Sequence, residues 1–256
     1  MSIPTIFACE AAYLSCFTTK TVEAQFDRLT DDALPDMYAH NLIRLHAGLS
    51  ESDWHAIVAA ELAARAGTSH CRIYAYEAPP ASLRTQYGDH MELSEDLFFR
   101  WAGDCSGWTS RPDVTLRRYA PDMEVDYLTL EDETHPNPTT PNFALRRARR
   151  FLAGIQANSS QFSHYLAYLD GKPVGQIHLF QEGQTVKLEN FVVRSDRQRQ
   201  GIGTAMMKFM LGEAARRNCA LTYLVAAEED TAKDMYLRMG FERLPLTRCA
   251  LDWLNP

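Results

Sequence analysis

The sequence lacks the patterns by which metal sites and disulfide frameworks are usually recognised. Its 256 residues include six cysteines, but none of them forms a Cys-x-x-Cys pair. None of the eight histidines lies in a His-Glu-x-x-His pattern or at metal-ligand spacing from a cysteine. Scattered thiols are typical of reduced cysteines in a cytoplasm. We therefore predict that the protein binds no metal and is cytoplasmic.

An excess of positive charge and a long apolar run are also missing. The chain has a formal net charge of -7 and a pI near 5.6, so a nucleic-acid phosphate backbone is not expected as its partner. No apolar run approaches the roughly 20 residues of a membrane-spanning helix. The apolar stretch 6–17 is interrupted by Glu10 and follows no basic residue, which argues against a signal peptide. We expect a soluble protein without a membrane or nucleic-acid partner.

The C-terminal half has the clearest periodicity. Apolar alternation around an Asp-Gly turn and a second glycine turn predicts a meander of three antiparallel strands. A helical period, a short apolar strand and a second helix, stopped by Gly240, come next. The predicted strands span 162–169, 173–181, 185–193 and 220–226, and the helices 202–218 and 231–239. The fold class is therefore α/β, with a mixed, largely antiparallel sheet.

The segment before this half has weaker signals. It predicts a strand at 114–119, a helix starting at Pro121, a loop with three prolines at 131–141 and a helix at 142–157.

In the first 113 residues, Ser50 and Asp53 are spaced as a capping pair for a helix at 50–66. A strand at 71–76, a short helix ended by Gly88 and a strand at 93–101 follow, with 103–113 as a linker. This order resembles the order after Ile202, so we predict that the region is a degenerate copy of the same half-domain. Length allows one or two domains. We place an N-terminal α/β region at 1–113 and the main domain at 114–256.

The stretch Val192–Thr204 lies between a predicted strand and a predicted helix. Gly201 and Gly203 permit close backbone approach, and the first amides of the helix form a natural anion site. Arg199 adds a positive charge. Alone, such a pattern is as typical of a tight turn as of a phosphate loop. The third glycine of a Rossmann site and the Gly-Lys-Ser/Thr of a Walker A loop are both missing.

Three motifs in order identify a resemblance to the GCN5-related N-acetyltransferase (GNAT) superfamily over 114–256. Gln198-Arg199-Gln200-Gly201-Ile202-Gly203 resembles its motif A. Ala232, Tyr236, Gly240 and Phe241 match Ala-x-x-x-Tyr-x-x-x-Gly-Phe, and Asp-Gly-Lys-Pro-Val-Gly at 170–175 matches the preceding hairpin. The resemblance implies a GNAT fold with a central V-shaped split between the strands 185–193 and 220–226, and acetyl-CoA as co-substrate.

The resemblance also implies roles for individual residues. Tyr236 matches the tyrosine that protonates the departing thiolate, with helix packing as the alternative. Glu189 lies where many relatives place a general base, with a surface glutamate as the alternative. Glu229 departs from the usual asparagine, which puts that contact with the cofactor arm in doubt. The cofactor-binding residues implied are Phe191, Val192, Val193, Gln198, Arg199, Gln200, Gly201, Ile202, Gly203 and Thr204.

These features predict an N-acetyltransferase that transfers the acetyl group directly to a primary amine in a ternary complex. Six carboxylates between Asp122 and Glu133 favour a small cationic acceptor, unless they form only a solvated face. The alternatives are a protein or peptide N-acetyltransferase and a non-catalytic acyl-CoA-binding module. A homodimer is left open.

Overall fold

The computed structural model describes residues 3–109, 111–135 and 142–254. The chain forms two compact units. The first unit comprises Met1–Cys16, Phe99–Val225 and Leu237–Glu242. The second unit comprises Phe17–Phe98, Ala226–Tyr236 and Arg243–Pro256. Each unit thus combines separate stretches of the chain, and the domain division between residues 113 and 114 stays a prediction.

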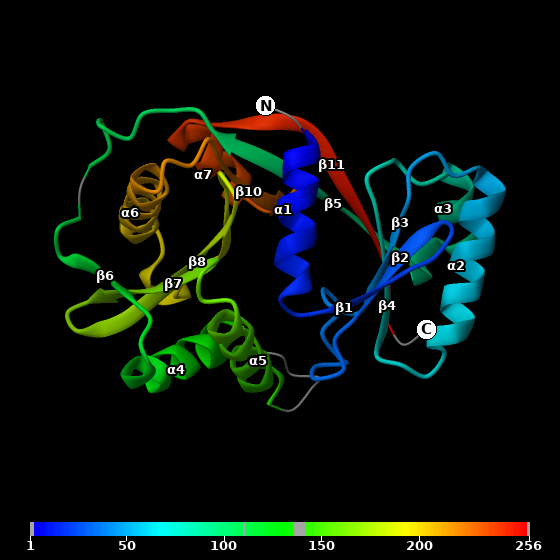
Figure 1. Cartoon of the computed structure of the whole chain (residues 1–256), viewed down its shortest axis with the longest axis horizontal. Coiled ribbons are helices and arrows are strands. Elements are labelled where there is room, and N and C mark those ends of the chain that lie inside the picture. Colours follow the sequence, from blue (N-terminus) through cyan, green and yellow to red (C-terminus); the bar gives the residue numbers. More distant parts are fainter. Residues whose placement is uncertain (1–2, 110, 136–141, 255–256) are drawn as a thin grey trace. The chain divides into compact units, whose positions relative to one another are not determined.

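The strands of the first unit form the predicted meander. β6 (Val114–Arg118), β7 (Phe162–Leu169), β8 (Lys172–Glu182) and β9 (Thr185–Val193) pair antiparallel in this order, and β10 (Leu221–Ala227) pairs parallel to β9 (Figure 1). Asp170 and Gly171 between β7 and β8 have φ of 51° and 73°, as a two-residue hairpin turn requires. The mixed, largely antiparallel sheet predicted from the sequence is therefore confirmed.

Helices cover both faces of these strands. α4 (Glu124–Thr134) and α5 (Phe143–Ala157) share a core with β7, formed by Tyr127, Leu130, Ala148, Leu152 and Leu166 among others. α6 (Ile202–Arg216) contacts β6, β8 and β9 from the side opposite to α4 and α5 (Figure 1).

A helix that the sequence did not predict, α1 (Ile3–Ser15), also packs on β8 and β9. Its Tyr13 ring lies edge-on to Phe180, with ring centroids 5.5 Å apart. In the sequence this apolar stretch resembles only an interrupted signal peptide, whereas in the structure it packs into the core of the first unit.

One boundary in this unit was predicted wrongly. A loop was expected from residue 131, but α4 continues to Thr134. The reason is that the first proline is Pro136, so nothing breaks the helix earlier, and Glu131 is buried in an ion pair with Arg147. The remainder of that predicted loop, 136–141, lies outside the described residues.

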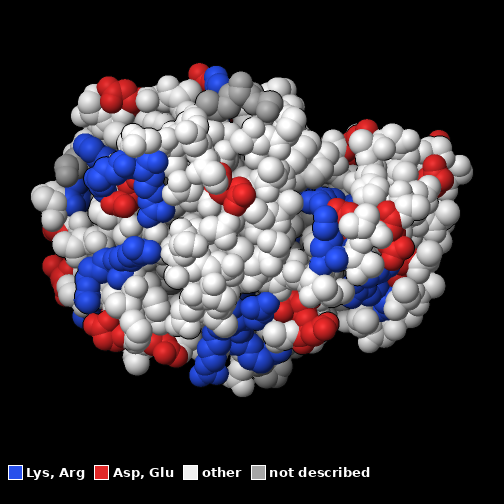
Figure 2. Space-filling view, in the orientation of Figure 1, with Lys and Arg blue, Asp and Glu red and all other residues white. Residues whose placement is uncertain are grey.

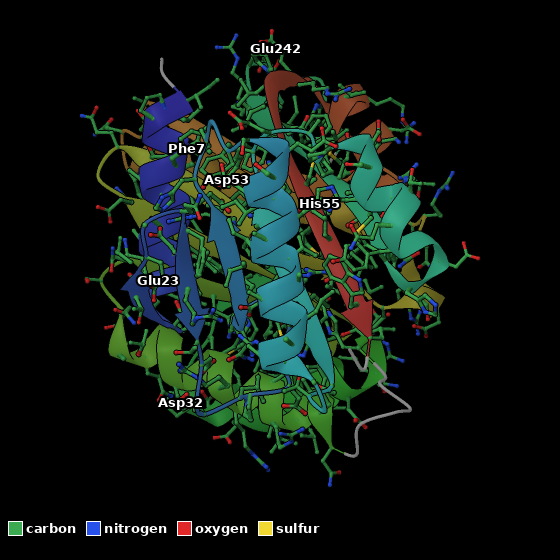
Figure 3. The ribbon with its side chains drawn as sticks, turned by 90° about the vertical axis from the view of Figure 1, so that its right-hand side faces the viewer. Phe7, Glu23, Asp32, Asp53, His55 and Glu242 are labelled. Atoms are coloured by element: carbon green, nitrogen blue, oxygen red, sulfur yellow. The ribbon has the colours of Figure 1, made fainter. Side chains whose placement is uncertain are left out.

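The second unit contains a β-α-β crossover between parallel strands. β3 (Leu42–Leu45) pairs parallel with β4 (His70–Ala75), and α2 (Glu51–Arg65) connects them. α2 begins with the predicted capping box, in which Ser50 and Asp53 each bond the backbone amide of the other. Asp53 and His55 mark this helix in Figure 3. The predicted helix at 50–66 is confirmed.

The other strands of this unit extend the sheet on both sides. β1 (Thr19–Val22) and β2 (Phe26–Thr30) pair antiparallel up to β3, and the last strand, β11 (Phe241–Leu254), pairs antiparallel with β4. α3 (Ala81–Tyr87) and β5 (Glu92–Trp101) complete the unit and agree with the predicted elements. β1, β2, β3 and β11 were not predicted, because these segments lack clear alternation.

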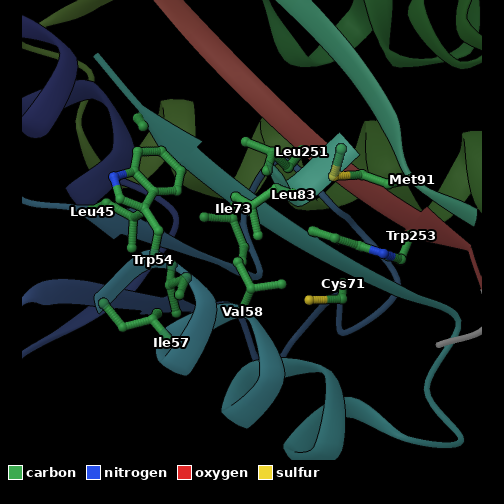
Figure 4. Close-up of a cluster of buried hydrophobic side chains, with 12 residues drawn as sticks. Leu45, Trp54, Ile57, Val58, Cys71, Ile73, Leu83, Met91, Leu251 and Trp253 are labelled. Carbon is green, nitrogen blue, oxygen red and sulfur yellow. The ribbon is translucent and has the colours of Figure 1, made fainter. Parts of the chain in front are cut away.

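The core of the second unit forms between α2 and the strands. Trp54, Ile57 and Val58 of the helix pack against Ile73 of β4 and Leu251 of β11, all at most 6% exposed (Figure 4). α7 (Ala232–Met239) lies between β10 and β11 in the chain. It ends at Gly240, whose φ of 96° confirms the predicted glycine stop.

Candidate functional site

The candidate site begins where β9 and β10 stop pairing. Their parallel register runs from Thr185 opposite Leu221 to Leu188 opposite Leu224 and ends there, although β9 continues to Val193. On its other side, β9 stays paired with β8 up to Gly175 opposite Val193. The backbone groups of residues 189–193 that face β10 are therefore not used by that ladder, and an extended ligand can pair with them.

A bulge bends β9 at the point where this pairing ends. The register between β8 and β9 shifts between Gln176 and His178, and Asn190 has a left-handed φ of 51°. A bulge of this kind increases the twist of one strand against its neighbour. The bulge explains locally why β9 diverges from β10 after Leu188.

The segment after β9 forms an open turn at the start of α6. A single 3-10 turn, η3 (Ser195–Arg197), is followed by Arg199 and Gly201, which both have left-handed φ, of 60° and 80°. Gly201 is the N-cap of α6, and no side chain caps the helix there. The first amides of this 15-residue helix point to the loop, which is exposed from Gln198 to Gly201. This is the geometry of an anion site at a helix N-terminus.

Side chains of the predicted cofactor residues fasten this loop to β9. Gln198 donates from Nε2 to the carbonyl oxygen of Val193 at 3.1 Å, which ties the loop to the end of the strand. A Cβ at Gly203 would lie 3.2 Å from Cζ of Phe191, so the glycine allows that ring to pack on the first turn of α6. Ile202 is buried beneath the loop, at 1% exposure. The predicted residues from Phe191 to Thr204 thus lie together in the first unit.

Arg111 also touches this loop and was not predicted. Its guanidinium donates to the carbonyl oxygen of Gln200 and forms two hydrogen bonds with the Asp113 carboxylate, at 2.8 and 2.5 Å. Arg111 lies in the segment 103–113, which the sequence predicts to be a linker. The separation of 89 positions from Gln200 left no pattern by which the contact could be found.

Glu189, the candidate base, is held by a lysine. Its Oε2 lies 2.7 Å from Nζ of Lys187, and its side chain is 34% exposed. Lys187 is itself buried and also pairs with Glu10 of α1. Neither Lys187 nor Glu10 was predicted to be part of the site. The alternation of the strand does not show which residue pairs with Lys187, and the helix α1 that carries Glu10 was not predicted.

Tyr236, the candidate acid, lies in α7 and is 6% exposed. It belongs to the second unit, whereas Glu189 and the loop 198–204 belong to the first. Its role as acid therefore stays a prediction. Glu229, at the position where relatives carry asparagine, is exposed between β10 and α7.

A second group of buried polar residues joins α4, α5 and the strands β7, β8 and β9. Glu131 is fully buried and pairs with Arg147, which also donates to Oδ1 of Asn190 at 3.2 Å. Burial lowers the pKa of His164 to about 3 and lowers that of His178 well below its ordinary value. Both imidazoles are therefore neutral in the folded protein near neutral pH.

The acidic segment 122–133 is consequently less uniform than the sequence suggested. Glu131 contributes no surface charge, Asp122 lies 3.7 Å from Arg117, and Glu133 lies 3.1 Å from Arg194. Figure 2 shows acidic side chains over α4 next to a basic patch over α5. The charge on this face of the first unit is mixed.

Two further properties concern the described part of the chain as a whole. Among residues 3–109, 111–135 and 142–254, no group of three or more His, Cys, Asp or Glu side chains is arranged to hold a metal ion. Over the same ranges, every helix is too short or too polar to cross a membrane.

Comparisons with known proteins agree with this geometry. The acetyltransferase (GNAT) family model matches residues 123–241. The comparison with curated proteins gave no match. Among solved structures, a functionally unknown conserved protein from Staphylococcus epidermidis is similar with a TM-score of 0.77 and 20% identity, over 93% of this chain and 95% of that chain.

Two GCN5-related N-acetyltransferases are also similar in fold. The protein from Kribbella flavida has a TM-score of 0.66 and 16% identity, over 99% of this chain and 96% of its own. The protein from Sphaerobacter thermophilus has a TM-score of 0.63 and 14% identity, over 92% and 82%. The GNAT fold predicted from the motifs is thus confirmed. The match of residues 123–241 to the acetyltransferase (GNAT) family model and the GNAT fold of these neighbours support an acyltransferase.

Proposed function

We propose that the protein transfers the acetyl group of acetyl-CoA to a primary amine of a small molecule. One observation carries the proposal: the stretch of β9 that no longer pairs with β10 leads, through one 3-10 turn and a short loop, into the start of α6, which no side chain caps. An open strand edge and an anion site therefore follow one another along the chain, and one extended ligand can contact both. A long, phosphorylated thioester such as acetyl-CoA is complementary to both.

The residues of the first unit fit the parts of acetyl-CoA. We assign the first-turn amides of α6 and the exposed Arg199 to the pyrophosphate. The backbone of Phe191, Val192 and Val193 pairs with the pantetheine arm, and an amide of Val192 or Val193 is the donor for the carbonyl oxygen in the transition state. Gln198 and Arg111 act indirectly, by holding the loop.

The chemistry needs two proton transfers by residues of this chain. The acceptor amine must be neutral to attack the thioester carbonyl, and Glu189 receives its proton directly or through water. The departing thiolate takes a proton from the Tyr236 phenol. The C–S bond breaks and a C–N bond forms, so no redox partner is required.

A small cationic amine is the acceptor that we favour. Four carboxylates of the segment 122–133 are exposed: Asp122, Glu124, Asp132 and Glu133. They attract a cationic ligand less strongly than six would, because two of them lie near arginines and Glu131 is buried. A peptide amino terminus is the alternative acceptor, and a non-catalytic acyl-CoA-binding module is the alternative function. Glu229, in place of asparagine, is what keeps the second alternative open.

A screen of acceptors tests the proposal. Thiol release from acetyl-CoA is measured with a polyamine, an aminoglycoside and a short peptide with a free amino terminus, each against a reaction without amine. We expect amine-dependent release with the polyamine or the aminoglycoside. Thiol release with the peptide, and with neither the polyamine nor the aminoglycoside, would show that the acceptor is a peptide and not a small molecule. Binding of acetyl-CoA without release for any amine would favour the non-catalytic module.

A further inference from the structure

Lys187 lies buried between two carboxylates of different elements. Its side chain is 4% exposed, and Nζ is 2.8 Å from Oε1 of Glu10 and 2.7 Å from Oε2 of Glu189. The ring centroid of Tyr13 is 4.3 Å from the same ammonium. A buried ammonium is tolerated only when it is paired, and here it is paired twice. Lys187 therefore bridges α1 and β9.

The Glu10 end of this bridge is anchored. Glu10 is almost fully buried, and its Oε1 accepts a hydrogen bond from the Tyr223 hydroxyl of β10 at 2.7 Å. Burial raises the pKa of Tyr223 well above its ordinary value, so the phenol stays protonated and able to donate. Glu10 belongs to α1, outside the residues 123–241 that the family model matches.

The Glu189 end of the bridge is open. Oε2 of Glu189 is taken by Lys187, whereas Oε1 makes no hydrogen bond or ion pair within the described part of the chain. Glu189 is the first residue of β9 after the pairing with β10 ends. One carboxylate oxygen is thus held by Lys187, and the other is left without a side-chain or backbone partner among the described residues, on a side chain that is 34% exposed.

We propose that Lys187 is a positioning residue that orients Glu189, and that α1 supplies the anchor through Glu10. The inference rests on the proposed function, in which Glu189 receives the proton of the amine. α1 thereby becomes part of the acceptor side of the site, although it lies outside the matched domain. Other titratable or charged groups near this bridge are Cys9, Tyr13, Arg147, His178 and Tyr223.

Two substitutions at the bridge have opposite expected effects on the pH profile of turnover. Lys187→Met removes the positive charge next to Glu189, so the pH of half-maximal turnover should rise by about one unit. Glu10→Gln removes the competing carboxylate, so Lys187 pairs with Glu189 alone and the same pH should fall. Lys187→Met should also lower kcat by about tenfold or more and leave KM for acetyl-CoA within about twofold.

Glu242→Gln is the matched control, because it removes a carboxylate of the first unit from a pair with Arg100 at the surface. Its pH profile should equal that of the wild type. A loss of folded protein alone would lower activity without moving the profile. If Lys187→Met does not fold, the Glu10→Gln variant still tests the inference, because its pH of half-maximal turnover should fall below that of the wild type. Profiles that stay unmoved, or that move in the same direction in both variants, overturn the inference.

Glu189→Gln separates this inference from the proposed function. If that variant turns over the amine as fast as the wild type, the assigned base is wrong. If it is inactive while the profiles of the bridge variants do not move, the base stands and the positioning role fails. Should no amine be accepted, crystal structures of the variants decide. Glu189 should change its side-chain conformation in Lys187→Met and keep it in Glu10→Gln, and an unchanged Glu189 in Lys187→Met would overturn the inference.

Discussion

Arg111 lies directly against Gly201, the N-cap of α6: a Cβ at Gly201 would be 3.4 Å from Cγ of Arg111. The glycine also has a φ of 80°, which L side chains rarely adopt. Two independent constraints therefore act at the position where the proposed pyrophosphate site begins. A side chain at 201 would both strain the loop and displace the arginine that holds it.

Gly201→Val should therefore abolish measurable binding of acetyl-CoA or weaken it by about tenfold or more. Isothermal calorimetry with acetyl-CoA measures the affinity. Gly67→Val is the matched control, because Gly67 has a φ of 82°, nothing within 4 Å of its Cβ position and a place in the second unit. Equal affinity in the Gly201→Val protein and the wild type would mean that the pyrophosphate binds elsewhere.

Tyr236→Phe should lower kcat by about 10²-fold and leave the affinity for acetyl-CoA nearly unchanged, because only a proton donor is removed. Steady-state kinetics with the best amine and calorimetry with acetyl-CoA give the two quantities. Tyr87→Phe, another tyrosine of the second unit, is the control. Unchanged kcat would assign Tyr236 to packing.

Local patterns predicted the elements that carry the cofactor site. The Asp-Gly turn, the glycine at the N-cap of α6 and the alternation of β9 act over a few residues, so neighbouring positions suffice to recognise them. The capping box of Ser50 and Asp53 is of the same kind. These features were sufficient to predict the order of strands and helices from Phe162 onward.

Contacts between distant positions could not be predicted in the same way. Glu10 and Lys187 are far apart in the sequence, and nothing in the pattern of either segment names the other as its partner. The burial of Glu131 depends on Arg147, which lies on another helix, so the sequence suggested an exposed carboxylate. That the first 113 residues are a degenerate copy of the half-domain after Ile202 stays a prediction.

Arg147→Met should destabilise the protein by about 3–5 kcal/mol, because it leaves the fully buried Glu131 carboxylate without its cation. Urea unfolding measures the change in the free energy of unfolding. Arg149→Met on the exposed side of α5 is the control and should change it by less than about 0.5 kcal/mol. In the Glu131→Leu background, Arg147→Met should cost much less. Equal costs in both backgrounds would show that the pair does not couple.

Two buried histidines should make the protein unstable in mild acid. Burial holds the pKa of His164 at about 3 and that of His178 well below its ordinary value, whereas both titrate near pH 6.5 in the unfolded chain. Above pH 6.5 neither state binds a proton at these groups, so they contribute no pH dependence. Below it the unfolded chain binds protons that the folded protein excludes, and the free energy of unfolding falls.

Each histidine contributes up to about 1.4 kcal/mol per pH unit to the pH dependence of the free energy of unfolding. The two together therefore contribute a slope of up to about 2.7 kcal/mol per pH unit between roughly pH 6 and pH 4. Urea unfolding at pH 7.5, 6.0 and 5.0 measures this slope. In His178→Leu this slope should fall by up to about 1.4 kcal/mol per pH unit, because one proton fewer is taken up on unfolding. In His90→Leu, at an exposed position, the slope should stay nearly unchanged. A free energy of unfolding that is constant between pH 7.5 and 5.0 would contradict the assignment, because it would require both imidazoles to be protonated as readily in the folded protein as in the unfolded chain.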